Sequence, residues 1–214
     1  MNFYEQLLEQ TRIPREYLHN SPIIVRVFDG RVNTSEYIAF LTEAYYHVSH
    51  TVPLLMAVGA RLDMEQEWLR RAMAKYIEEE TGHQDWILND ITTAGGDADS
   101  VKNGRPILAT ELMISYAYDS IYRVNPVCLL GMILVLEGTS VTLADKAANK
   151  IRQQTGLPEQ AFTYLKTHGE LDLQHMEFFK SVINKISQKS DQADIIHATN
   201  VFYRLYATIF RSLG

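Results

Sequence analysis

The strongest metal-binding pattern in the sequence is the segment His168-Gly-Glu-Leu-Asp172-Leu-Gln-His175. Positions i, i+4 and i+7 of a helix share one face, so His168, Asp172 and His175 point in the same direction. Leu165 and Phe179 extend this face, which indicates that it is turned inward. Buried imidazoles and carboxylates are costly to desolvate unless a partner satisfies them, and a divalent metal ion does so. The alternative interpretation is a solvated polar stripe on a surface helix.

A second segment, Glu78-Glu79-Glu80-Thr-Gly-His83, contains a Glu-x-x-His pair formed by Glu80 and His83. Carboxylate-bridged di-iron bundles use this i, i+3 spacing to direct two ligands into their interior. Glu79, at i, i+4 from His83, is the rival ligand. Runs of glutamate more often mark solvated helix, so this pair alone does not establish a site.

A lone carboxylate, Glu137, interrupts an apolar run that extends from Leu130 to Val141. Its helical neighbours are apolar or small, and a carboxylate is rarely buried in such surroundings without a partner. A salt bridge is the alternative, but no basic residue lies between Arg123 and Lys146. A metal ion or a histidine from another helix is therefore the favoured partner.

The fourth segment, Glu43-Ala-Tyr-Tyr-His47-Val-Ser-His50, aligns one acid and two imidazoles at i, i+4 and i+7. Glu43 could supply a bridging carboxylate, whereas His47 and His50 are better explained as core residues or as partners of the ligands. Histidine and carboxylate ligands without cysteine suit iron or manganese. Carboxylates from four helices could bridge two such ions, and five tyrosines could line a pocket beside them: Tyr45, Tyr46, Tyr116, Tyr118 and Tyr122.

These segments lie in helices, because apolar residues recur at three- and four-residue steps and no stretch shows strand-like alternation. A helix is expected to begin at residues 33–36 and to continue to a kink before Pro53. Further helices are expected over about 65–89, 106–123, 126–155 and 158–189, with a last one from Asp191. We predict a single domain, residues 1–214, built as an all-α bundle of about seven helices.

Length and composition exclude several classes of protein. The chain has 214 residues, of which 46% are hydrophobic and 21% charged, as in soluble globular domains. A net charge of −6 argues against nucleic-acid binding. The N-terminus does not look like a signal peptide, and the longest apolar stretch, Val127 to Leu136, is too short to span a bilayer. With Cys128 as the only cysteine, we expect a cytoplasmic protein with no membrane or nucleic-acid partner.

In these blocks and their order, over about residues 30–190, the chain resembles the haem-oxygenase-like superfamily, which includes TenA-like thiaminase II and PqqC-like proteins. It is most similar to the haem-oxygenase-like di-iron oxidases, also called iron-containing redox enzymes. The resemblance implies a haem-oxygenase-like bundle and the metal ligands Glu43, Glu80, His83, Glu137, His168, Asp172 and His175. Two alternatives stay open, Glu79 in place of Glu80 and His47 in place of Glu43.

The resemblance also implies the chemistry. Two iron ions, with manganese an option for one of them, would activate O2 and oxidise a small organic substrate of fatty-acid, amino-acid or aromatic type. An electron donor would be a partner, and exposed helix faces would allow a homodimer.

Other functions predict different features. A TenA-like hydrolase needs a cysteine nucleophile, for which Cys128 is the only candidate, and a PqqC-like protein would also work without metal. Haem oxygenase needs a proximal histidine, such as His47, and an open glycine helix, for which Gly131 and Gly138 are available. A non-catalytic regulator or scaffold would pair its inward carboxylates with arginine or lysine.

Overall fold

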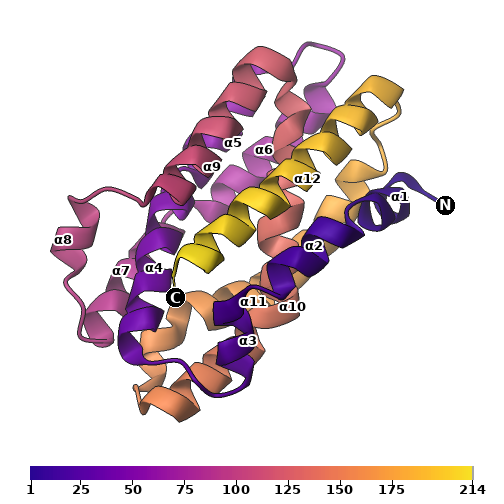
Figure 1. Ribbon diagram of the computed structural model, residues 1–214. Helices are drawn as coiled ribbons and strands as arrows, with labels where there is room; N and C mark the ends of the chain where they lie inside the picture. The colour runs from indigo at the N-terminus through magenta and orange to yellow at the C-terminus, as the bar shows by residue number, and fades with distance from the viewer. Residues whose placement is uncertain (214) are drawn as a thin grey trace.

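The computed structural model describes residues 1–213, apart from the side chains of residues 168–171. In this part of the chain every regular element is helical and no strand occurs. The helices, from α1 (Phe3–Gln10) to α12 (Lys189–Ser212), form one bundle (Figure 1). Their buried side chains make one continuous apolar core. The prediction of an all-α bundle is confirmed.

Three long helices form the middle of the bundle: α10 (Leu129–Thr155) packs against α11 (Thr163–Ile183) and α12. Gly131 allows the close approach of α10 and α12, because a Cβ atom there would lie 2.7 Å from the backbone nitrogen of Thr199. By length and composition the segment Pro126–Thr155 could cross a membrane, but 61% of its most apolar window is buried inside the fold. It therefore has the character of a core helix of a soluble protein.

The helix α4 (Thr34–Val48) begins where the sequence predicts. The Asn33 side chain accepts a hydrogen bond from the Glu36 backbone N–H at 3.0 Å, and the Glu36 carboxylate accepts one from the Asn33 N–H at 2.9 Å. This reciprocal pair satisfies amides that have no partner within the helix. The kink expected before Pro53 is a break at residues 49–50, after which α5 (Thr51–Arg61) begins.

The helix expected over 65–89 is two helices, α6 (Glu67–Glu80) and α7 (His83–Thr93). The helix is interrupted at Thr81 and Gly82, where Gly82 adopts a φ of +94° that residues with a Cβ atom rarely take. Glu80 and His83 therefore lie on opposite sides of a turn, and their i, i+3 relation is not that of one continuous helix. The prediction of one continuous helix over 65–89 was wrong, although the Glu80 carboxylate and the His83 imidazole still meet at 3.1 Å.

Other boundaries also differ from the expected ones. The segment 106–123 forms α9 (Leu108–Asp119) and a π-helical turn (Ser120–Val124), and a short 3₁₀ turn (Pro126–Cys128) precedes α10. The segment 158–189 forms a second 3₁₀ turn (Glu159–Phe162) followed by α11. The first 30 residues, for which the sequence predicts no individual helix, form α1, α2 (Arg12–His19) and α3 (Pro22–Phe28). The short helix α8 (Ala98–Lys102) lies between α7 and α9. These divisions give the bundle more segments than the seven expected.

Candidate metal centre

Four helices bring acidic and imidazole side chains to one buried position. Glu80 ends α6, His83 begins α7, Glu137 lies in α10, and Asp172 and His175 lie in α11. All but Glu137 are less than 8% exposed, and the Glu137 side chain is 12% exposed. The sequence prediction that these five residues come together is therefore met by the packing of the helices.

Four carboxylates surround the imidazole of His175. Its Nδ1 lies 3.5 Å from Asp172 Oδ1, 3.5 Å from Glu80 Oε1 and 3.7 Å from Glu137 Oε1, and its Nε2 lies 3.5 Å from Glu79 Oε2. These distances are longer than good hydrogen bonds. The cluster holds four carboxylates against the two imidazoles of His175 and His83, so its acids outnumber its imidazoles.

Several polar atoms of the cluster are buried without a hydrogen-bond partner among the described residues: Nδ1 of His175 and one carboxylate oxygen each of Glu79 and Glu137. Buried polar groups are almost always paired, so these atoms indicate a missing binding partner. Ligand atoms of Glu80, Glu137 and His175 all lie within 4.8 Å of one another. Ligands of one ion lie about 2.0–2.2 Å from it, hence within about 4.5 Å of each other, so this group fits a metal ion after small side-chain shifts.

The protonation of the cluster reflects the same excess of acids. Burial, and then the charges of Asp172, Glu80 and Glu79, raise the pKa of Glu137 well above its usual value. Burial opposes protonation of His175, but the nearby carboxylates of Asp172, Glu80 and Glu79 raise its pKa overall. A bound cation would reverse both effects by stabilising the ionised carboxylates and the neutral imidazole.

Glu80 is the more central of the two rival glutamates on α6. Its carboxylate lies 3.1 Å from Nδ1 of His83, and the residue is 7% exposed. The Glu79 side chain is 33% exposed and forms an ion pair with Lys75 at 3.3 Å. The ring of His83 stacks on Trp86 with 4.1 Å between the ring centroids, which fixes the orientation of the imidazole.

The structure separates Glu43 from its alternative, His47. The Glu43 carboxylate faces the backbone N–H of Ile107 at 3.2 Å, at the start of α9. His47 lines the cavity described below, together with Glu80 and Glu137. Among the described residues, His47 is thus the member of this pair that belongs to the cavity lining, and Glu43 does not. His168, the remaining predicted ligand, is one of the residues whose side chains lie outside the described part of the chain.

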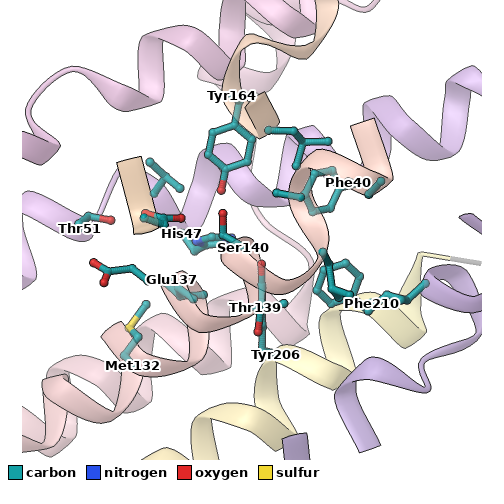
Figure 2. A pocket seen from close by; sticks show the side chains of 18 of the residues that line it. Phe40, His47, Thr51, Met132, Glu137, Thr139, Ser140, Tyr164, Tyr206 and Phe210 are labelled. Carbon is teal, nitrogen blue, oxygen red and sulfur yellow. The ribbon is translucent and has the colours of Figure 1, made fainter. Parts of the chain in front are cut away.

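Three acids of the cluster, Glu80, Glu137 and Asp172, form one part of the lining of a cavity of ≈ 160 Å³. Figure 2 shows Glu137, His47 and Thr51 on one side of this space and Phe40 and Phe210 on the other, with hydroxyl groups between them. Its tyrosines are not the five expected from the sequence, since Tyr46 donates to the Val101 carbonyl and Tyr118 bonds to His50 instead. The tyrosines that line it are Tyr37, Tyr76, Tyr164 and Tyr206.

Tyr76 is a functional candidate that sequence reasoning missed. Its ring packs edge-on against His175 with 5.9 Å between ring centroids, and its hydroxyl is buried without a hydrogen-bond partner. Burial and then the charges of Glu137, Glu79 and Glu80 raise its pKa. Its position one helical turn before Glu80 was the signal available in the sequence.

Fold comparisons define the structural class. A haem oxygenase-like domain of unknown function from Shewanella denitrificans superposes with a TM-score of 0.89 and 23% identity, over 100% of this chain and 92% of that one. A TenA homologue from Pseudomonas syringae superposes with a TM-score of 0.82 and 11% sequence identity, over 99% of this chain and 92% of that one. Haem oxygenase-1 from the cyanobacterium Synechocystis, in complex with haem, superposes with a TM-score of 0.77 and 12% sequence identity, over 100% of this chain and 93% of that one. The predicted haem-oxygenase-like fold is confirmed.

The sequence itself matches the iron-containing redox enzyme family over residues 38–207. The chain therefore belongs to this family, as the resemblance of its motifs predicts. No curated protein matches the chain significantly in sequence.

Proposed function

We propose that the protein is a non-haem oxidase or oxygenase that binds two iron ions and uses O2 to oxidise a small organic substrate. Membership of the iron-containing redox enzyme family supports the use of iron. The observation that carries the proposal is the buried excess of carboxylate around His175, with oxygen and nitrogen atoms left without partners.

The donor set fits iron. Glu80, His83, Glu137, Asp172 and His175 would hold the ions, with further ligands from His168 and from either Glu43 or His47. Carboxylates bind hard, higher-valent ions well and imidazole suits iron, while manganese remains an option at one position. The reduced metal would supply the electrons that activate O2.

The residues around the centre have roles of their own. The carboxylates hold positive charge in a region from which the surrounding apolar side chains exclude water, and this strengthens their electrostatic effect. Tyr76 offers a hydroxyl proton beside the ligands, and the cavity gives a substrate access to them. The remaining features of the proposal are an electron donor as partner, a cytoplasmic location, no nucleic-acid or membrane partner, and a homodimer formed through exposed helix faces.

The rival functions fit less well. Cys128 is 2% exposed and burial raises the pKa of its thiol to about 12, which makes it a poor nucleophile for a TenA-like hydrolase. Gly131, which an open haem-binding helix would need, packs against Thr199. A regulator would pair its inward acids with basic residues, but in the described part of the chain Glu80 and Glu137 form ion pairs only with histidine.

The test is an anaerobic titration with Fe(II), in which the wild-type protein is expected to bind two ions per chain. Glu80→Gln should lose tight binding, whereas Glu78→Gln changes an exposed residue of the same helix and should keep it. Circular dichroism of both variants checks that the helices persist. No binding by the wild-type protein, or equal binding by both variants, would contradict the proposal, and a Soret band after haem addition would favour haem oxygenase.

A further inference from the structure

The cavity extends well beyond the acid cluster into an apolar region, here called the apolar arm. Its lining side chains come from α3, α4, α10 and α12, and they include Val27, Phe40, Ala144, Ala147 and Phe210. Figure 2 shows Phe40 and Phe210 on the side of the cavity away from Glu137. A cavity of about 150 Å³ with aliphatic and aromatic walls binds a molecule such as benzene. The arm therefore suits the apolar body of a small molecule.

The cavity also offers hydroxyl groups beside the acid cluster, and Figure 2 shows that of Ser140 between Glu137 and Phe40. The oxygen atoms of Tyr76 and Ser140 are both buried and have no hydrogen-bond partner in the described part of the chain. Ser140 lies one turn after Glu137 on α10, and Tyr76 one turn before Glu80 on α6, so each adjoins a residue of the cluster. An unpaired buried hydroxyl costs free energy, and a ligand's polar group would remove that cost.

The charge of the lining limits what that polar group can be. Among the described lining residues there is no lysine or arginine, while Glu36, Glu80, Glu137 and Asp172 are all present. Arg26, which lies near this region, is already paired with Glu36. In the metal-free protein, a ligand with a free carboxylate or phosphate would thus find acids and no lysine or arginine to neutralise it.

We propose that the cavity binds a slender, mainly apolar molecule with one small uncharged polar end, such as a hydroxyl or carbonyl group. The polar end lies at the hydroxyls of Tyr76 and Ser140, beside the acid cluster, and the apolar body fills the arm. This assignment rests on the proposed function in one respect, because it takes the acid cluster as the reacting end. In the metal-free protein it favours an aliphatic or arylalkyl alcohol over a carboxylate of the same length.

The test measures binding of linear primary alcohols, from hexanol to dodecanol, to the metal-free protein by calorimetry. Each added methylene group that enters the arm should tighten binding by about fourfold, the equivalent of its transfer out of water. The increase should stop once the arm is full. Carboxylates of equal length should bind at least about tenfold more weakly, because the lining offers no countercharge.

Two variants separate the arm from the polar end. Ala147→Phe should abolish the gain in affinity with chain length for the longer alcohols. The longest alcohol should bind about tenfold more weakly, because two or more of its methylene groups no longer fit in the arm. Ala74→Phe, on an exposed face of α6, is the matched control and should change nothing. Tyr76→Phe should weaken every alcohol by the same factor, about fivefold for one hydrogen bond, and leave the gain per methylene intact.

Three results would overturn the proposal. They are an alcohol affinity that does not depend on chain length, equal affinities of the wild-type protein and Ala147→Phe for the longest alcohols, and equal affinities for an alcohol and a carboxylate of the same length. Because these measurements use no metal, they are independent of the iron titration. Chain-length dependence without iron binding would leave the binding site standing and remove the oxidase. Iron binding without alcohol binding would leave the proposed oxidase standing and remove the alcohol-binding site.

Discussion

Two buried carboxylates in this bundle have opposite surroundings. Asp90 on α7 is 0% exposed and accepts hydrogen bonds from the backbone N–H groups of Thr163 and Tyr164 at 3.0 and 2.8 Å, where α11 begins. Glu137 on α10 has one oxygen with no partner and acids as neighbours. Asp90 is a structural residue that caps a helix. Glu137 is costly to the fold, and such a cost is expected where a protein binds a ligand.

Glu43 belongs with Asp90 in this comparison. It is buried, yet its carboxylate faces the amide of Ile107 and so has a local explanation. Burial of an acid alone therefore does not identify a metal ligand. The useful distinction is whether the folded chain already supplies donors to the carboxylate.

The largest expected effect is on stability at Asp90. Asp90→Ala should lower the free energy of unfolding by about 3 kcal/mol, because it leaves two amides unpaired and removes two charge-assisted hydrogen bonds. Urea denaturation measures the change, with the exposed Asp85→Ala on the same helix as control. Iron stoichiometry should be unaffected. An unchanged midpoint in Asp90→Ala would show that the cap carries little energy.

The next largest effect is expected on iron binding when His175 is replaced. His175→Ala should weaken Fe(II) binding by about a hundredfold or more while preserving the helical circular dichroism, since it removes the group that all four acids approach. His197→Ala, on an exposed part of α12, is the control and should bind iron normally. Normal iron binding by His175→Ala would place the metal elsewhere.

The metal-free protein should lose stability as the pH rises. The pKa of Glu137 is raised above its usual 4.5, and that of His175 is also raised, so the folded chain holds protons that the unfolded chain releases. The contribution of Glu137 to the free energy of unfolding is fully present below pH 4.5, the usual pKa of glutamate. It is lost as the pH rises through the raised pKa of Glu137 in the folded chain.

Glu137→Gln should make this decline shallower, by up to about 1.4 kcal/mol per pH unit, in urea titrations of the metal-free protein. Iron binding should show the opposite trend and strengthen with pH, because the ligands must be deprotonated. Parallel pH profiles for the wild-type protein and Glu137→Gln would mean that Glu137 is ionised in the metal-free fold.

The smallest effect is expected at Cys128. Cys128→Ala should cost about 1 kcal/mol of stability through a small cavity, with iron binding and oxidase turnover unchanged. The buried thiol lies 3.9 Å from the Asp194 carbonyl and has no role in the proposed chemistry. Loss of turnover in this variant without loss of iron would instead favour a cysteine nucleophile.

Much of this architecture could be predicted from the sequence because its signals are local. The capping pair Asn33 and Glu36 marks the start of α4, and the apolar run around Glu137 marks a core helix. The break at Gly82 was missed, because a glycine inside a helical pattern is common and its positive φ depends on how α6 and α7 pack.

The candidate site was predictable in part for the same reason. Asp172 and His175 share a helix face, so helical spacing identifies them together. The position of Glu43 depends on Ile107, which is distant in sequence, and no spacing rule reveals that contact. Tyr76 was overlooked because a tyrosine on an apolar face is usually a packing residue, and only the absence of a partner for its hydroxyl sets it apart.

We infer that the acid cluster holds metal. Crystals loaded anaerobically with Fe(II) and measured at the iron absorption edge test it most directly. We expect two anomalous peaks within bonding distance of Glu80, Glu137 and His175. Full loading in solution with no peak at these side chains would contradict it.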